Sequence, residues 1–282
     1  MKIYRSLLLL IAFIIITASV VFSSPVKYHW LTNKYNPSES VENRITVPDG
    51  YKRTNAPKNS FKHWLRNLPL KKQGTAVYLH NGKKKYNQYA HFSVVDIDTG
   101  SKNLQQCADS IIRLRAEYLY STGNYKAIRF NFTSGDNIPF QKWIQGYRPV
   151  VSGNKVTWRK SGKYDSSYAN LRKYLETIFL YAGSYSLSNE LQSADIHEME
   201  IGDIFIKGGF PGHAVIVADM AVSKTGREKL FLLAQSFMPA QDMHILKNPG
   251  NHVLDPWYEV DFGDELRTPE WIFKKKQLKR FK

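Results

Sequence analysis

One cysteine, one histidine and one glutamine could together carry out nucleophilic chemistry. Cys107 is the single cysteine of the 282 residues, and a thiolate at a helix N-terminus is a strong nucleophile. His213 would serve as its general base, and Gln235 would fix the tautomer of that imidazole. Asp219 and Asp242 are alternative orienting residues. Cys107 could equally be a small apolar residue on a buried helix face.

The order of residues brings His213 and Gln235 within reach of each other. The segment IKGGFPGHAV (206–215) crowds three glycines and a proline before His213, which is typical of a loop that leads into a strand. Two strand-like runs flank a turn at SKTGRE (223–228). A hairpin centred on this turn places both side chains on one face, whereas a slip of one residue would separate them.

Helical and strand-like patterns predict an α+β fold. The clearest helix covers 101–123, where apolar residues recur at helical spacing and Cys107 falls in the first or second turn. A second helix is predicted over 166–183. The last third alternates short strands with turns, so we expect a central antiparallel β-meander with packed helices.

The chain divides into a leader, an irregular segment and one domain. Residues 1–24 have two cations, an apolar run and then small residues, the layout of a secretory signal peptide, with an uncleaved anchor as the alternative. Residues 25–70 are predicted as an irregular lead-in, and 71–282 as a single globular α+β domain with a basic C-terminal tail. We expect an exported protein that is periplasmic, envelope-associated or extracellular.

The charge favours anionic partners. The formal charge is +16, and removal of two cations with the signal leaves +14 (16 − 2). Such a surface favours encounter with anionic polymers or lipid head groups, although a solvated basic face is the simpler interpretation. The chain contains no nucleic-acid module, no phosphate loop and no spacing typical of a zinc site. We therefore expect neither a metal nor a cofactor, and the pattern does not predict an oligomeric state.

A second constellation could bind a ligand. The segment 132–148 gathers Asp136, Trp143, Tyr147 and Arg148 around glycines. Aromatic faces together with an arginine fork suit a sugar or a carboxylate-bearing ligand. The alternative is a packed loop with an internal pair between Arg148 and Asp136.

The order of a cysteine on a helix, a histidine that opens a strand and a polar residue on the next strand resembles the papain-like cysteine hydrolases. The segment IGDIFIKGGFPGHAVIVAD (201–219) is similar to NlpC-type endopeptidases and CHAP amidases. This resemblance implies a papain-like arrangement with Cys107 as nucleophile, His213 as base and Gln235 as orienter. The chain departs from these families in two features. The residues around its cysteine are QQCAD, and the separation of 106 residues (213 − 107) between the cysteine and the histidine exceeds the usual spacing.

The chain as a whole resembles an uncharacterised family of exported bacterial proteins, domain of unknown function 4846. The likeness is carried by LQQCADSIIRLRAEYLY, FNFTSGD, GYRPV, YAGSYSLSNEL, GDIFIKGGFPGHAVIVADMA and FLLAQSFMPAQDMHILKNP. It implies residence in the bacterial envelope or outside the cell.

Two functions are therefore expected from the sequence. The first is a cysteine amidase or peptidase that acts on cell-envelope peptides. The alternative is a non-catalytic envelope protein that binds an anionic glycan or peptide.

Overall fold

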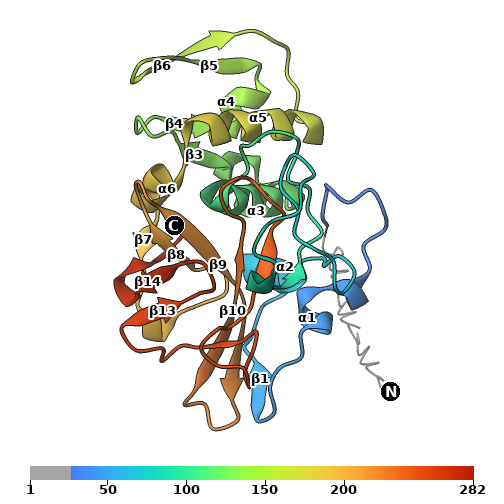
Figure 1. The fold of residues 1–282 in the computed structure, drawn as a ribbon. Helices are drawn as coiled ribbons and strands as arrows, with labels where there is room; N and C mark the ends of the chain where they lie inside the picture. The colour runs from blue at the N-terminus through green and yellow to red at the C-terminus, as the bar shows by residue number, and fades with distance from the viewer. Residues whose placement is uncertain (1–26) are drawn as a thin grey trace, which may run out of the picture.

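The computed structural model describes residues 27–282, which form a mixed α+β fold (Figure 1). The predicted signal peptide, residues 1–24, lies outside the described residues. No helix within 27–282 combines the length and the apolar character needed to cross a bilayer. The helices are α1 (Val41–Arg44), α2 (Phe61–Arg66), α3 (Cys107–Ser121), α4 (Phe140–Ile144), α5 (Tyr168–Tyr181) and α6 (Ser184–Glu190).

A large antiparallel sheet organises the body and contains the predicted central meander. Its order is β2-β11-β10-β9-β8-β15-β7, with β1 also paired to β9 and β12 also paired to β10. The successive strands β8, β9, β10 and β11 are direct neighbours, which is the meander. The strands are β1 (Tyr51–Arg53), β2 (His91–Val94), β7 (Gln192–Ser193), β8 (Ile204–Lys207), β9 (His213–Ser223), β10 (Lys229–Gln235), β11 (His244–Leu246), β12 (Tyr258–Glu259) and β15 (Leu278–Arg280).

Strand β9 is the centre of the fold. Ten of its eleven residues are buried, so both faces of this strand are covered, in contrast to a strand with one face exposed to solvent. Helices α2 and α3 pack against it. The hairpin of β13 (Glu265–Arg267) and β14 (Ile272–Lys274) also contributes to the core, where Phe273 lies 6.0 Å from Phe205 of β8 between ring centroids.

Helix α3 is enclosed on nearly every side, beyond the single apolar stripe that the sequence predicts. Arg113 and Glu117 are buried within it, and they pair with each other at 3.3 Å. Tyr168 of α5 donates to Glu117 at 2.7 Å, and Asp98 pairs with Arg113 at 2.6 Å. These partners satisfy two charged side chains that would otherwise be costly to bury.

The two ends of the described chain are integrated into the body. Residues 27–70, predicted as an irregular lead-in, supply β1 and α2 and bury Trp64 and Leu65 in the core. The predicted basic tail instead forms β15, which pairs with β8 and β7. Leu278 is fully buried there, which explains why this charged segment joins the sheet.

A smaller layer lies above the sheet in Figure 1. It consists of α4, α5 and two hairpins, with Phe140 and Trp143 packed against Tyr174 of α5. The hairpins are β3 (Arg129–Asn131) with β4 (Asn137–Pro139), and β5 (Tyr147–Ser152) with β6 (Lys155–Lys160).

Candidate functional site

Cys107 is the first residue of α3. The helix begins here because the preceding Gln106 serves as its N-cap. The backbone amide of Gln106 donates a hydrogen bond to Asp109 Oδ2 at 3.1 Å. The predicted start at 101 is therefore too early, and the cysteine does not lie a turn inside the helix. The side chain is partly exposed. Its sulfur interacts with the backbone amides of Cys107 and Ala108 at the N-terminus of the helix.

A β-bulge sets the register that brings the predicted histidine and glutamine together. The pairing of β9 with β10 shifts by one residue after Leu232, and beyond this point Ile216 faces Ala234. Continuing this register makes His213 the diagonal neighbour of Gln235 on one face of the sheet. Without the bulge the two side chains would lie on opposite faces.

His213 and Gln235 are in direct contact. The distance from His213 Nε2 to Gln235 Oε1 is 2.8 Å, and both side chains are buried. An amide oxygen can only accept, so the histidine carries its hydrogen on Nε2 and leaves Nδ1 as a base. The thiol interacts with the backbone amide of Ala214, the residue after this histidine. No hydrogen bond joins thiol and imidazole directly in the described part of the chain.

Cys107 and His213 line the same cavity, which has a volume of about 400 Å³. Its walls are mainly apolar and come from α3, the end of α5, the loop before β9 and the loop after β10. Trp271 of the C-terminal hairpin closes one side, with its ring centroid 5.3 Å from that of His213. The apolar wall residues include Leu104, Phe179, Phe210, Phe237, Met238 and Trp271.

The glycines before His213 allow close packing rather than leaving space open. A Cβ atom at Gly212 would lie 2.3 Å from the Gly209 oxygen and 2.4 Å from Ser184 Oγ. Gly208 similarly lies against Ser188 of α6. The loop can therefore approach α6 only without side chains at these two positions. This approach places the loop on the wall of the cavity.

Burial determines the resting charge of the two reactive groups. It raises the pKa of the Cys107 thiol to about 11, and the nearby Asp109 carboxylate adds to this shift. Burial also lowers the pKa of the His213 imidazole to about 4. The favourable amides at the start of α3 do not outweigh burial. At pH 7 the thiol and the imidazole in this cavity are consequently both neutral.

Asp109 provides a test of this electrostatic description. Burial raises the pKa of its carboxyl to about 8, and Oδ1 has no hydrogen-bond partner within residues 27–282. The folded state therefore holds a proton that the unfolded state releases, so stability falls as the pH rises from about 4 to about 8. We expect Asp109→Asn to gain stability relative to the wild type over this range, by at most about 1.4 kcal/mol per pH unit.

Urea unfolding at pH 5 and pH 8 measures this difference. Asp261→Asn is the control, because Asp261 is exposed. Parallel pH dependences for Asp109→Asn and the wild type would show that the carboxyl is already ionised in the folded protein.

The four predicted ligand-binding residues lie in the layer of α4 and the hairpins, apart from the cavity of Cys107. Trp143 is 4% exposed, and the Arg148 guanidinium lies 3.9 Å from its ring centroid. The Trp143 indole donates a hydrogen bond to Asn170 Oδ1 at 2.9 Å. A ring that is buried and covered in this way has no face left for a sugar.

The other members of this group have different neighbours. Asp136 accepts a hydrogen bond from Ser134 at 2.9 Å and does not pair with Arg148. Tyr147 lies beside Lys160, with the ammonium 5.3 Å from its ring centroid. The four residues therefore do not converge on one open surface.

The alternative orienting residues are engaged elsewhere. Asp219 pairs with Arg53 and Arg66, and Asp242 pairs with Lys71. Within residues 27–282 no group of three or more histidine, cysteine or acidic side chains is arranged to hold a metal ion. The sequence pattern missed Asp109 and Trp271, since neither belongs to a recognisable motif.

Comparison with known proteins identifies the family of the chain. A family model described as "Domain of unknown function (4846)" matches residues 41–280, from α1 to the last strand of the sheet. No curated protein and no solved structure matches the chain.

Proposed function

The chain belongs to the family of domain of unknown function 4846, and from this premise we propose that it is an exported cysteine hydrolase that cleaves amide bonds of cell-envelope peptides. One observation carries this proposal: Cys107 and His213 line a single cavity, and Gln235 holds the far nitrogen of the imidazole. This is the composition of a nucleophile, a base and an orienting group.

The reaction begins from the neutral pair. As the sulfur of Cys107 attacks the substrate carbonyl carbon, its proton passes to His213 Nδ1. The carbonyl oxygen becomes an oxyanion, which the amides at the start of α3 stabilise. The imidazolium then protonates the leaving amine, and a thioester remains. Water hydrolyses the thioester, with His213 again accepting the proton, which restores the thiol and releases a carboxylic acid.

A papain-like arrangement accompanies this mechanism. Its support is the placement of the three residues at the ends of their elements: the first residue of α3, the first residue of β9 and the last residue of β10. The register shift after Leu232 adds to this support, because it puts His213 and Gln235 on one face of the sheet.

The envelope substrate is proposed from the cavity walls and the charge of the chain. The apolar walls suit a small apolar side chain next to the cleaved bond. The formal charge of +16 favours an anionic polymer carrying the peptide. The signal-like layout of residues 1–24 supports export.

The mature chain, residues 25–282, tests the proposal when it is incubated with peptide fragments of purified bacterial cell wall. Mass spectrometry should show fragments that gain the mass of one water, with a new amine and a new carboxylate. Hydrolysis should change little with pH through the neutral range, because the pair stays neutral between the His213 pKa of about 4 and the Cys107 pKa of about 11. Binding of the fragments without any cleavage would reject the hydrolase.

A second candidate, binding of an anionic glycan or peptide without catalysis, is favoured by a separate cavity of about 530 Å³. Arg115 lies on its wall between the rings of Phe61 and Phe281, at 5.0 and 5.2 Å from the ring centroids. This guanidinium makes no ion pair within residues 27–282, so its fork is free for an anion. The other cations on the wall are Lys126, Arg129 and Lys282, with Glu190 as the acidic residue.

The two candidates differ in their dependence on single residues. Binding that survives loss of the Cys107 thiol and disappears in Arg115→Gln, with no cleavage in either protein, would establish the second candidate in place of the first.

A further inference from the structure

Every polar atom of the Gln235 side chain is engaged. Its Oε1 accepts from His213 Nε2 at 2.8 Å. Its Nε2 donates to Glu270 Oε2 at 2.8 Å and lies 3.3 Å from His244 Nε2. Because His244 Nδ1 donates to the Asp242 carbonyl at 2.9 Å, its Nε2 is free to accept. The two amide hydrogens and the amide oxygen therefore all have matching partners.

The orientation of this amide determines which nitrogen of His213 is the base. If the amide turned over, its oxygen would face the Glu270 carboxylate and the lone pair of His244. Its hydrogens would face His213 Nε2, which would then have to be the unprotonated nitrogen. Nδ1 would become the donor and could not take a proton from the thiol. The site therefore depends on keeping the amide from turning over.

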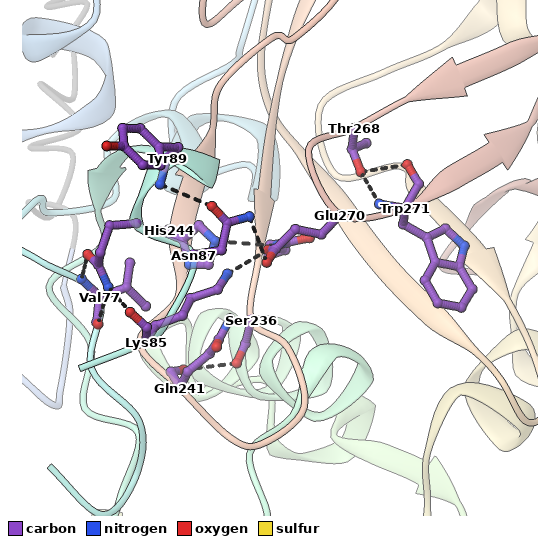
Figure 2. Close-up of polar contacts among 12 residues, drawn as sticks. Val77, Lys85, Asn87, Tyr89, Ser236, Gln241, His244, Thr268, Glu270 and Trp271 are labelled. Carbon is purple, nitrogen blue, oxygen red and sulfur yellow. Dashed lines mark hydrogen bonds and ion pairs between the residues drawn. The ribbon is translucent and has the colours of Figure 1, made fainter. Parts of the chain in front are cut away.

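Glu270 is the charged group that opposes this reversal. It lies in the turn between β13 and β14 and reaches toward Lys85 and Asn87, whereas the neighbouring Trp271 ring points the other way (Figure 2). Lys85 Nζ is 2.5 Å from Glu270 Oε2, and Asn87 donates to Oε1 at 3.3 Å. The Lys85 and Glu270 side chains are 7% and 13% exposed. A carboxylate held in this way can only accept from the Gln235 amide.

We propose that Glu270 is a positioning residue: it fixes the Gln235 amide and through it the Nε2–H tautomer of His213. The inference rests on the proposed function, in which His213 is the general base. Glu270 does not line the cavity of Cys107, so it acts through Gln235 alone. The turn between β13 and β14 thus supplies both Trp271, which forms a wall of the cavity, and Glu270, which fixes the proton on His213 Nε2.

Glu270→Gln is the direct test, since the new amide keeps the size of the side chain but can either donate or accept. The ¹⁵N chemical shifts of the His213 ring in the mature chain report the tautomer without any substrate. We expect Nε2–H alone in the wild type and a fraction of Nδ1–H in the variant. With cell-wall peptides, kcat should fall by the same factor as the population of the Nε2–H tautomer, roughly 2-fold to 10-fold, with little change in KM. An unchanged Nε2–H tautomer in Glu270→Gln would overturn the proposal.

Asn87→Ser is the matched control, because it removes the contact to Oε1, the carboxylate oxygen that does not face Gln235. This variant should keep the wild-type tautomer. If Glu270→Gln does not fold, adding Lys85→Met removes both charges of the buried pair and leaves neither unpaired. The same change of tautomer is expected in that double variant, and its absence there would equally overturn the proposal.

The two readouts separate this inference from the proposed function. A tautomer that changes with Glu270→Gln in a chain that cleaves no peptide supports the positioning role and rejects the hydrolase. Peptide cleavage by a wild-type chain whose tautomer does not respond to the substitution rejects the positioning role alone.

Discussion

Cys107→Ser is expected to reduce the rate of amide hydrolysis by about 10⁴-fold or more. A hydroxyl is a much weaker nucleophile than a thiol and needs a strong base to lose its proton. Burial lowers the pKa of His213 to about 4, so this imidazole is a poor base for serine. The measurement is the initial rate of amine release from cell-wall peptides by equal concentrations of both proteins.

A matched control is available on the same helix. Ser121→Ala removes a hydroxyl at the opposite end of α3, where it donates to the Tyr118 carbonyl, and should keep the wild-type rate. The circular dichroism spectra and unfolding midpoints of Cys107→Ser and the wild type should agree, because the two side chains differ by one atom. Retention of more than a few per cent of the activity in Cys107→Ser would remove the thiol from the reaction.

The pairing of His213 with Gln235 was predictable in outline from local patterns. Strand alternation and the turn at 223–228 limit the register to a few choices, and only some of these bring the two residues together. The structure adds a bulge in which Ala218 of β9 has no partner on β10, which shifts the register by one residue after Leu232. A bulge has no sequence signal in an all-apolar run such as AVIVA (214–218), because every register buries the same kind of side chain.

Other parts of the site depend on long-range contacts that local patterns do not report. Glu270 and Lys85 are 185 residues apart in the chain, and neither lies in a motif. Trp143 shows the opposite difficulty: an aromatic residue near glycines is typical of a ligand site and of a core loop alike, and only its burial against Arg148 distinguishes them. The central meander was more predictable, because its strands are neighbours in sequence.

Local patterns also do not predict that both ends of the described chain join the sheet. Residues 51–53 and 278–280 are rich in lysine and arginine and lack the pattern of a buried strand. They nevertheless pair with β9 and β8. At the N-terminal end a buried carboxylate makes this arrangement favourable, and it also explains why Asp219 is not an orienting residue of the site.

Asp219 joins three separate elements through two ion pairs. Its carboxylate on β9 is 2.7 Å from Arg53 Nε of β1 and 2.6 Å from Arg66 Nε of α2. The Asp219 side chain is fully buried, and Arg66 is 6% exposed. The carboxylate also accepts from the Met220 amide at 2.8 Å. These contacts satisfy an acidic group that would otherwise be too costly to bury.

Asp219→Ala should therefore lower the free energy of unfolding by about 3–5 kcal/mol, because it leaves two arginines near each other without their shared counter-charge. Urea unfolding, followed by tryptophan fluorescence and by circular dichroism, measures the change. Glu176→Ala is the control: its ion pair with Lys102 is exposed and should contribute less than about 1 kcal/mol. A similar small loss in Asp219→Ala would mean that water replaces the carboxylate. Asp219→Ala could also lose much of its free energy of unfolding and still keep the wild-type His213 tautomer in the folded protein. This result would show that β9 has two independent roles: it anchors residues 27–70, and it positions the imidazole.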